Sequence, residues 1–175
     1  MTLAAPLSAA LLVFAAAAPA KEPPMLRFGT DVKPTPSDSP PAGDDPAPLK
    51  VGAPTVKVEG GKVLGELVVE NPTDKALRVT VNPYGGSFPY GGTSPFTLGF
   101  GGEPAVKYSG ELFPPEPPRP LAIEFPAKAR VLFTADVTLK DYTWAGAPEV
   151  GLTWGFYFAK GKPVEGTVKV RLPKK

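Results

Sequence analysis

The sequence contains no histidine and no cysteine among its 175 residues. It therefore lacks the commonest general base, the commonest metal ligand, the thiol nucleophile and every disulfide. A zinc site would need carboxylates alone, which zinc seldom uses, and an activated serine would need a lysine base. The sequence predicts neither an enzyme nor a cofactor or metal site. Its 25 prolines and 19 glycines instead favour an all-β binding or accessory module.

A concentrated positive charge is also missing. The chain has 19 basic and 17 acidic residues, and the basic ones are scattered rather than gathered into a stripe. A phosphate backbone is bound through clustered Lys and Arg side chains. Nucleic acid is therefore excluded as an expected partner.

The single long apolar run lies at the start of the chain and predicts a signal peptide over residues 1–20. Leu11–Ala18 forms the apolar core, and Ala18-Pro19-Ala20 is a small-x-small cleavage site before Lys21. The basic n-region is missing, and an uncleaved anchor is the alternative, although Pro6 and the many alanines make a poor spanning helix. We expect a periplasmic or secreted protein with no membrane insertion after signal cleavage.

Residues 21–54 predict a Pro-rich disordered linker, because their nine prolines and small polar residues cannot bury enough apolar surface to offset the ordering entropy. Met25–Phe28 is the one apolar island, interpreted as part of this tail rather than as a docked strand.

Residues 55–175 predict an antiparallel, immunoglobulin-like β-sandwich of seven or eight strands, with a closed barrel as the alternative. A two-glycine turn at Gly60-Gly61 indicates a hairpin. Apolar and polar residues alternate in the windows expected to form strands, and no window has a sustained helical period. The windows are 55–59, 62–70, 77–82, 106–109, 121–125, 131–140, 150–158 and 168–172.

Residues 83–102 predict a Gly/aromatic contact loop. Pro-Tyr-Gly-Gly occurs at Pro83 and again at Pro89, and aromatic residues surround both copies. Aromatic rings on a loop supply contact area at low entropic cost, and they stack on sugars or proline. The predicted partner-binding residues are Tyr84, Phe88, Tyr90 and Phe96. The alternative is a long hairpin loop whose aromatics fold back on the domain.

Three further aromatics and a group of carboxylates are weaker candidates. Trp154 shares its parity with Leu152 and Phe156 and is expected in the core. Tyr142 and Trp144 have the other parity from Val137 and Leu139 and are expected to cap one end of the domain, with a second exposed aromatic pair as the alternative. Asp136, Asp141 and Glu149 lie near one another in sequence, as the paired carboxylates of a glycosidase would need to lie in space.

Two resemblances follow from the order of these motifs. The first is carried by Ser94-Pro-Phe-Thr-Leu98, Tyr108-Ser-Gly110, the Pro-rich stretch 114–120 and the strand 131–142. Through these segments the chain resembles the N-terminal β-sandwich domain of deuterolysin-like and peptidyl-Lys metalloendopeptidases. The resemblance covers residues 56–172, and the His-Glu-x-x-His helix of those enzymes is missing. It implies the fold of an accessory domain without the peptidase activity.

The chain also resembles chagasin-like protease inhibitors, which carry Asn-Pro-Thr, Gly-rich and Arg-Pro-aromatic loops. Here Asn71-Pro72-Thr73, the glycine pairs of 85–92 and Arg119-Pro120 correspond, but Leu121 replaces the aromatic residue.

Three functional hypotheses remain. The first is a non-enzymatic exported module of the cell envelope that binds a protein or glycan through loop 83–102. The second is a secreted protease inhibitor, which needs an exposed Asn71–Asp74 loop. The third is an enzyme that uses carboxylates alone.

Overall fold

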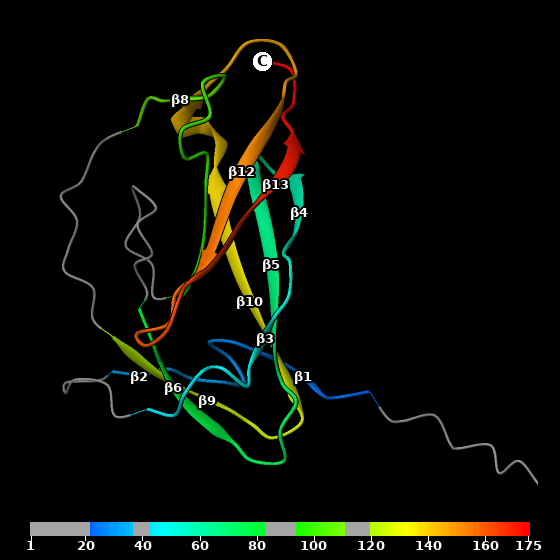
Figure 1. Ribbon diagram of the computed structural model, residues 1–175. Coiled ribbons are helices and arrows are strands. Elements are labelled where there is room, and N and C mark those ends of the chain that lie inside the picture. The colour runs from blue at the N-terminus through cyan, green and yellow to red at the C-terminus, as the bar shows by residue number, and fades with distance from the viewer. Residues whose placement is uncertain (1–21, 37–42, 83–93, 111–119) are drawn as a thin grey trace, which may run out of the picture.

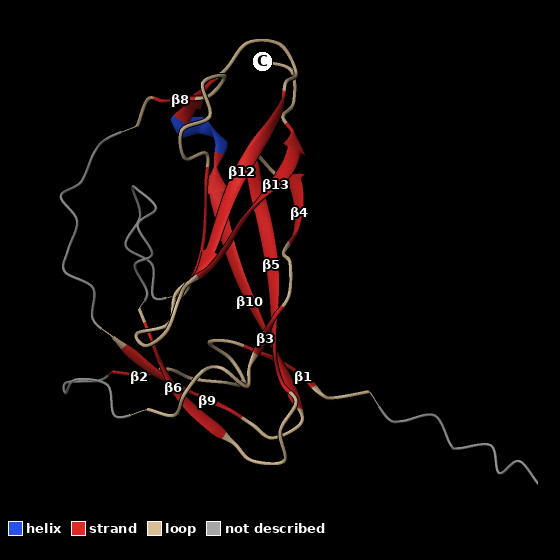
Figure 2. Cartoon of the chain, in the orientation of Figure 1, coloured by secondary structure: helices blue, strands red, loops and turns tan. Residues whose placement is uncertain are grey.

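The computed structural model describes residues 22–36, 43–82, 94–110 and 120–175, and almost every regular element in them is a β-strand (Figures 1 and 2). The prediction of an all-β fold is confirmed. The predicted signal peptide, residues 1–20, lies outside the described residues, as do residues 111–119, which include most of the Pro-rich stretch 114–120. In the described part of the chain, no helix is long and apolar enough to cross a bilayer.

The strands form several sheets, and their buried hydrophobic residues belong to one cluster. The largest sheet has the order β1-β10-β5-β3, and β4 also pairs with β5. The other sheets are β13-β12-β7, β2-β9-β6 and the small pair β11-β8. The strands in chain order are β1 (Met25–Arg27), β2 (Thr35–Pro36), β3 (Lys50–Val51), β4 (Thr55–Glu59), β5 (Lys62–Asn71), β6 (Leu77–Val81), β7 (Phe96–Gly99), β8 (Lys107–Tyr108), β9 (Leu121–Phe125), β10 (Ala129–Thr138), β11 (Tyr142–Thr143), β12 (Glu149–Phe156) and β13 (Val164–Arg171), with one short 3-10 helix, η1 (Leu139–Asp141).

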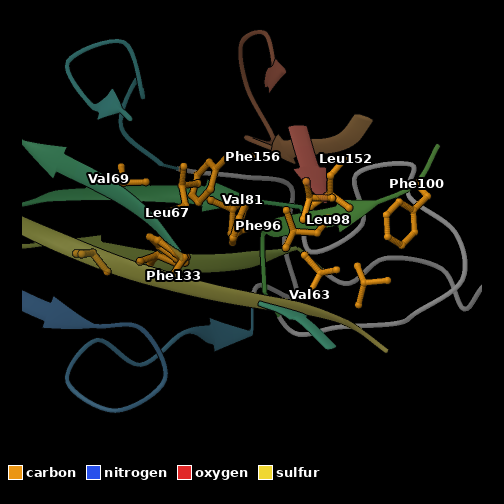
Figure 3. Packing of buried hydrophobic residues seen from close by; sticks show 14 of the residues in the cluster. Val63, Leu67, Val69, Val81, Phe96, Leu98, Phe100, Phe133, Leu152 and Phe156 are labelled. Carbon is orange, nitrogen blue, oxygen red and sulfur yellow. The ribbon is translucent and has the colours of Figure 1, made fainter. Parts of the chain in front are cut away.

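Alternation along the strands builds the core. On β5 and β10, residues of one parity are buried and those of the other face outward, as the sequence pattern predicts. The rings of Phe133 on β10 and Phe156 on β12 have centroids 5.0 Å apart, so the sheets that contain these two strands are in contact through these rings. Figure 3 shows these two side chains with Leu67 and Phe96 in the same cluster. Apolar burial of this kind is the main favourable term in folding.

Glycine makes two predicted features possible. Gly60 and Gly61 both have positive φ, 58° and 74°, and connect β4 to β5 in the expected two-glycine hairpin. Trp154 is half-buried rather than fully buried, and its indole lies over Gly166, the residue opposite it on β13, in the space that a Cβ would occupy. Its predicted place against the core is confirmed.

The structure corrects the prediction that residues 21–54 are a disordered linker. Residues 22–36 and 43–54, which we call the N-terminal belt, dock on the edges of four strands. β1 pairs in parallel with β10, β2 pairs with β9, and β3 pairs with β5. On the fourth strand, β6, Asp44 accepts a hydrogen bond from the Arg78 amide and donates its own amide to the Arg78 carbonyl, both at 2.8 Å.

The apolar island of the belt is a strand rather than a tail. Phe28 stacks on Phe133 at 4.8 Å, and Val32 is buried. The composition argument failed here because it required the segment to supply its own apolar partners. The belt instead uses the free backbone groups and apolar side chains of strand edges, where proline is tolerated.

Asn71 holds together two turns at the end of the core. Its side chain is fully buried, and its Nδ2 atom lies 2.8–3.1 Å from the carbonyl oxygens of Lys75, Phe125 and Pro126. Its Oδ1 atom accepts hydrogen bonds from the amide and hydroxyl of Thr73. The β5–β6 turn and the β9–β10 turn are thereby fixed to the same side chain.

Replacement of Asn71 by alanine should lower the free energy of unfolding by about 2–3 kcal/mol, because one buried and two part-buried carbonyl oxygens lose their donor group. Urea denaturation followed by tryptophan fluorescence measures this change. Asp74→Ala is the control in the same turn, since it removes only an exposed ion pair with Lys128 and should cost less than about 0.5 kcal/mol. Equal effects of the two substitutions would contradict the central role of Asn71.

Replacement of Phe28 by alanine should lower the unfolding free energy by about 1–3 kcal/mol, because the ring is partly buried against Phe133. Met25→Ala, in the same strand, is the control: Met25 is 43% exposed and should contribute under about 0.5 kcal/mol. If residues 22–36 do not dock in solution, both variants will match the native chain.

Candidate functional site

The candidate site is the place where residues 83–95 leave and rejoin the sheet. Val81 pairs with Phe158, and Phe96 pairs with Phe156, on the same edge of β12 and its extension. An unbroken strand along that edge would need one residue between Val81 and Phe96, opposite Tyr157. The sequence has fourteen residues there, 82–95. Strands β6 and β7 are therefore one strand interrupted by an insertion.

Hydrogen bonds close the strand across the insertion. The amide of Asn82 donates to the carbonyl of Tyr157 at 2.9 Å, and the amide of Tyr157 donates to the carbonyl of Pro95 at 3.3 Å. Asn82 and Pro95 thus share the two bonds that a single residue opposite Tyr157 would make. Both ends of the insertion are fixed at one point of the sheet.

The side-chain pattern also continues across the insertion. Val79 and Val81 are buried before it, and Phe96 and Leu98 are buried after it. If Asn82 is followed directly by Phe96, apolar and polar residues alternate without a break, as they do along a half-buried strand. The core therefore contains residues from both sides of the insertion.

The structure corrects the boundary of the predicted contact loop. Phe96 is 2% exposed, and Figure 3 shows it within the core cluster, so it is not a surface contact residue. Leu98 and Phe100 are buried as well. The predicted loop 83–102 is therefore confined to 83–95. Tyr84, Phe88 and Tyr90, the other three predicted contact residues, lie outside the described residues.

The outer face of β12 beside the insertion is lined by small residues. The ring of Tyr157 lies over Gly155, where it occupies the space of a Cβ. The hydroxyl of Thr153 donates to the carbonyl of Gly99 at 2.8 Å, and Glu103 accepts a hydrogen bond from the amide of Gly151. These contacts satisfy backbone groups where β7 ends, at the opposite end of that strand from the insertion.

The predicted carboxylate group does not form a common site through its described contacts. Asp136 pairs with Lys62 at 3.0 Å, and Glu149 pairs with Lys169 at 3.1 Å in another sheet. Asp141 lies in η1 at a third location. Within the described ranges, no group of three or more Asp or Glu residues is placed to hold a metal ion.

The Asn71–Asp74 turn differs from the exposed loop that the inhibitor hypothesis needs. Asn71 is fully buried, Pro72 and Thr73 are half-buried, and Asp74 is exposed. In this Asn-Pro-Thr sequence, Asn71 connects the β5–β6 turn to the β9–β10 turn through the hydrogen bonds described above. The other two loops of that resemblance, the glycine pairs of 85–92 and Arg119, lie outside the described residues.

Tyr142 and Trp144 lie at the far end of β12, as the end-cap prediction expects. Tyr142 is buried between Phe100 and Tyr108, with ring centroids 5.0 and 5.2 Å apart. Burial, with smaller contributions from Tyr108 and Asp141, raises the pKa of the Tyr142 phenol above its ordinary value of 10.0, so the phenol is neutral at physiological pH. Trp144 is half-buried and donates its indole N–H to the carbonyl of Pro173.

The interrupted strand was not predicted from the sequence, because it is recognised by the pairing of Val81 with Phe158 and of Phe96 with Phe156. The alternation of Val79, Val81, Phe96 and Leu98 is visible in the sequence once residues 83–95 are set aside.

Comparison with protein-family models, with curated proteins and with solved structures finds no match to this chain.

Deletion of residues 83–95 should leave a folded chain in which Asn82 pairs with Tyr157 and Phe96 stays in the core. The unfolding free energy should be unchanged or higher by about 1–2 kcal/mol, because the loop-closure entropy is no longer lost. Urea denaturation and the near-ultraviolet circular dichroism of the buried aromatics measure the outcome.

Deletion of residues 82–95 is the matched control and removes one residue more. It shifts the register by one position and turns Phe96 and Leu98 out of the core, which should unfold the chain or destabilise it severely. Similar stabilities for the two deletion variants would refute the interrupted-strand interpretation.

Proposed function

We propose that this chain is a non-enzymatic, exported binding or accessory module whose contact surface is the inserted segment 83–95. The observation that carries the proposal is the attachment of both ends of this segment to Tyr157. An insertion that leaves and rejoins a strand at one point does not serve strand pairing. Long loops of this kind on a rigid scaffold are typical places for binding residues.

The composition of the segment supports a contact role. It contains two Tyr-Gly-Gly repeats and the aromatic residues Tyr84, Phe88 and Tyr90, with no charged residue between positions 83 and 95. Aromatic side chains provide broad, partly polar contact area with few rotatable bonds. The partner class that fits is a protein or glycan of the envelope or exterior, because aromatic rings stack on sugar and proline rings.

The proposal includes the finer fold and location. The scaffold is an immunoglobulin-like β-sandwich, in which the core of seven or eight strands is supplemented by the N-terminal belt. The signal peptide, residues 1–20, directs the chain to the periplasm or exterior, and the belt begins directly after the proposed cleavage site. A stable scaffold with an inserted aromatic segment suits an accessory domain, the role implied by the resemblance to metalloendopeptidase N-terminal domains.

An affinity pull-down from the native envelope and secreted fractions tests this function. The mature chain, residues 21–175, should retain a protein or glycan that the chain lacking 83–95 does not retain. A second variant, with Tyr84, Phe88 and Tyr90 all replaced by alanine, should also lose the partner while its stability stays native. Phe96 must remain in both variants, because its loss would unfold the core.

Retention of the same partner by the native chain and by both variants would place the contact surface elsewhere. Failure of the native chain to retain anything from either fraction would contradict the binding function itself.

A further inference from the structure

The end of the molecule opposite the insertion holds an ammonium group in a defined set of contacts. The side-chain nitrogen of Lys175 lies 3.9 Å from the centroid of the Trp144 ring. The same nitrogen donates hydrogen bonds to the carbonyl oxygens of Leu139, at 3.4 Å, and Tyr142. Two carbonyl oxygens and one aromatic face suit a primary ammonium, which has three donors and a compact charge.

The receiving atoms are held by the core. Leu139 and Tyr142 are 3% and 6% exposed, and Tyr142 is fixed between the rings of Phe100 and Tyr108. Leu139 is the first residue of the 3-10 turn η1, and its carbonyl also accepts the backbone amide of Tyr142, the residue that caps the turn. A carbonyl oxygen has two lone pairs, so it can accept the ammonium as well.

The group that occupies these contacts is, by contrast, at the surface. Pro173, Lys174 and Lys175 are exposed, and the chain reaches this position through the amide of Lys175, which donates to the carbonyl of Gly146 at 3.4 Å. The Trp144 ring also makes a separate contact, because its indole N–H donates to the carbonyl of Pro173. Backbone acceptors of two buried residues therefore face an exposed occupant.

We propose that Leu139, Tyr142 and Trp144 form a receptor for a primary alkylammonium group, such as a lysine side chain of a partner, and that Lys175 occupies it in the free protein. Lys175 is then an internal competitor whose displacement accompanies binding. The receptor lies before the start of β12, and the inserted segment is attached after its end, so the two sites are separate.

The test is a titration with N-acetyl-lysine methylamide, followed by the two indole N–H signals in nitrogen–proton correlation spectra. Trp144→Phe assigns the Trp144 signal by its loss, and the Trp154 signal serves as the internal control. In Lys175→Met, which keeps the apolar stem and removes the charge, the probe should shift the Trp144 signal in a saturable way. The native chain should need at least about ten times more probe, because its own Lys175 is present at a high effective concentration.

Three further arms make the test specific. The same probe with its side-chain nitrogen acetylated should cause no shift, because it carries no charge. Butylamine distinguishes the source of the group: a response to butylamine but not to the lysine probe assigns the receptor to small amines, whereas a response to both assigns it to lysine side chains as well. The variant lacking residues 83–95 should respond like the native chain, which separates this proposal from the proposed function.

The proposal is overturned if neither the lysine probe nor butylamine gives a saturable shift of the Trp144 signal in Lys175→Met. It is equally overturned if the acetylated probe matches the charged one, or if the native and Lys175→Met chains respond at the same concentrations.

Discussion

The side-chain amide of Asn71 is the interaction on which the arrangement of sheets depends. The chain passes from one sheet to another after β5 and again after β9, and both turns are fixed to this one buried group. A buried amide with all its hydrogen bonds made specifies geometry, whereas one left unpaired is costly. One of its acceptors, the carbonyl of Phe125, belongs to the residue that pairs with Leu77 where β6 begins, so the amide lies at the start of the β6–β9 pairing.

Alternation along strands predicted much of this fold. The windows around β5, β10 and β12 were identified because apolar residues recur at every second position over eight to ten residues. β7 was missed because Phe96 and Leu98 follow two Tyr-Gly-Gly repeats and look like part of the same loop. The belt was missed because its strands are two or three residues long and Pro-rich, and edge pairing supplies what their own sequence lacks.

The candidate sites were predicted to different degrees. The repeats and aromatic residues of 83–95 are visible in the sequence, but the fact that they interrupt a strand is a property of pairing with Tyr157 and Phe158. The end-cap role of Tyr142 was inferred from its parity. The contact of the Lys175 ammonium with Trp144 and with the carbonyl of Leu139 was not predicted, because these residues are far apart in the sequence and local patterns do not indicate such pairs.

The position of the insertion bears on how this chain can change over generations. Asn82 and Pro95 meet at one residue of the sheet, so the pairing of the strand on either side does not depend on the number of residues between them. The length of a loop enters stability through the weak logarithmic dependence of loop closure. Substitutions, duplications or losses in that segment can therefore accumulate without a refolding cost. The Tyr-Gly-Gly duplication is the kind of change that such a tolerant junction permits, and the same junction gives an engineer a place to graft foreign sequences.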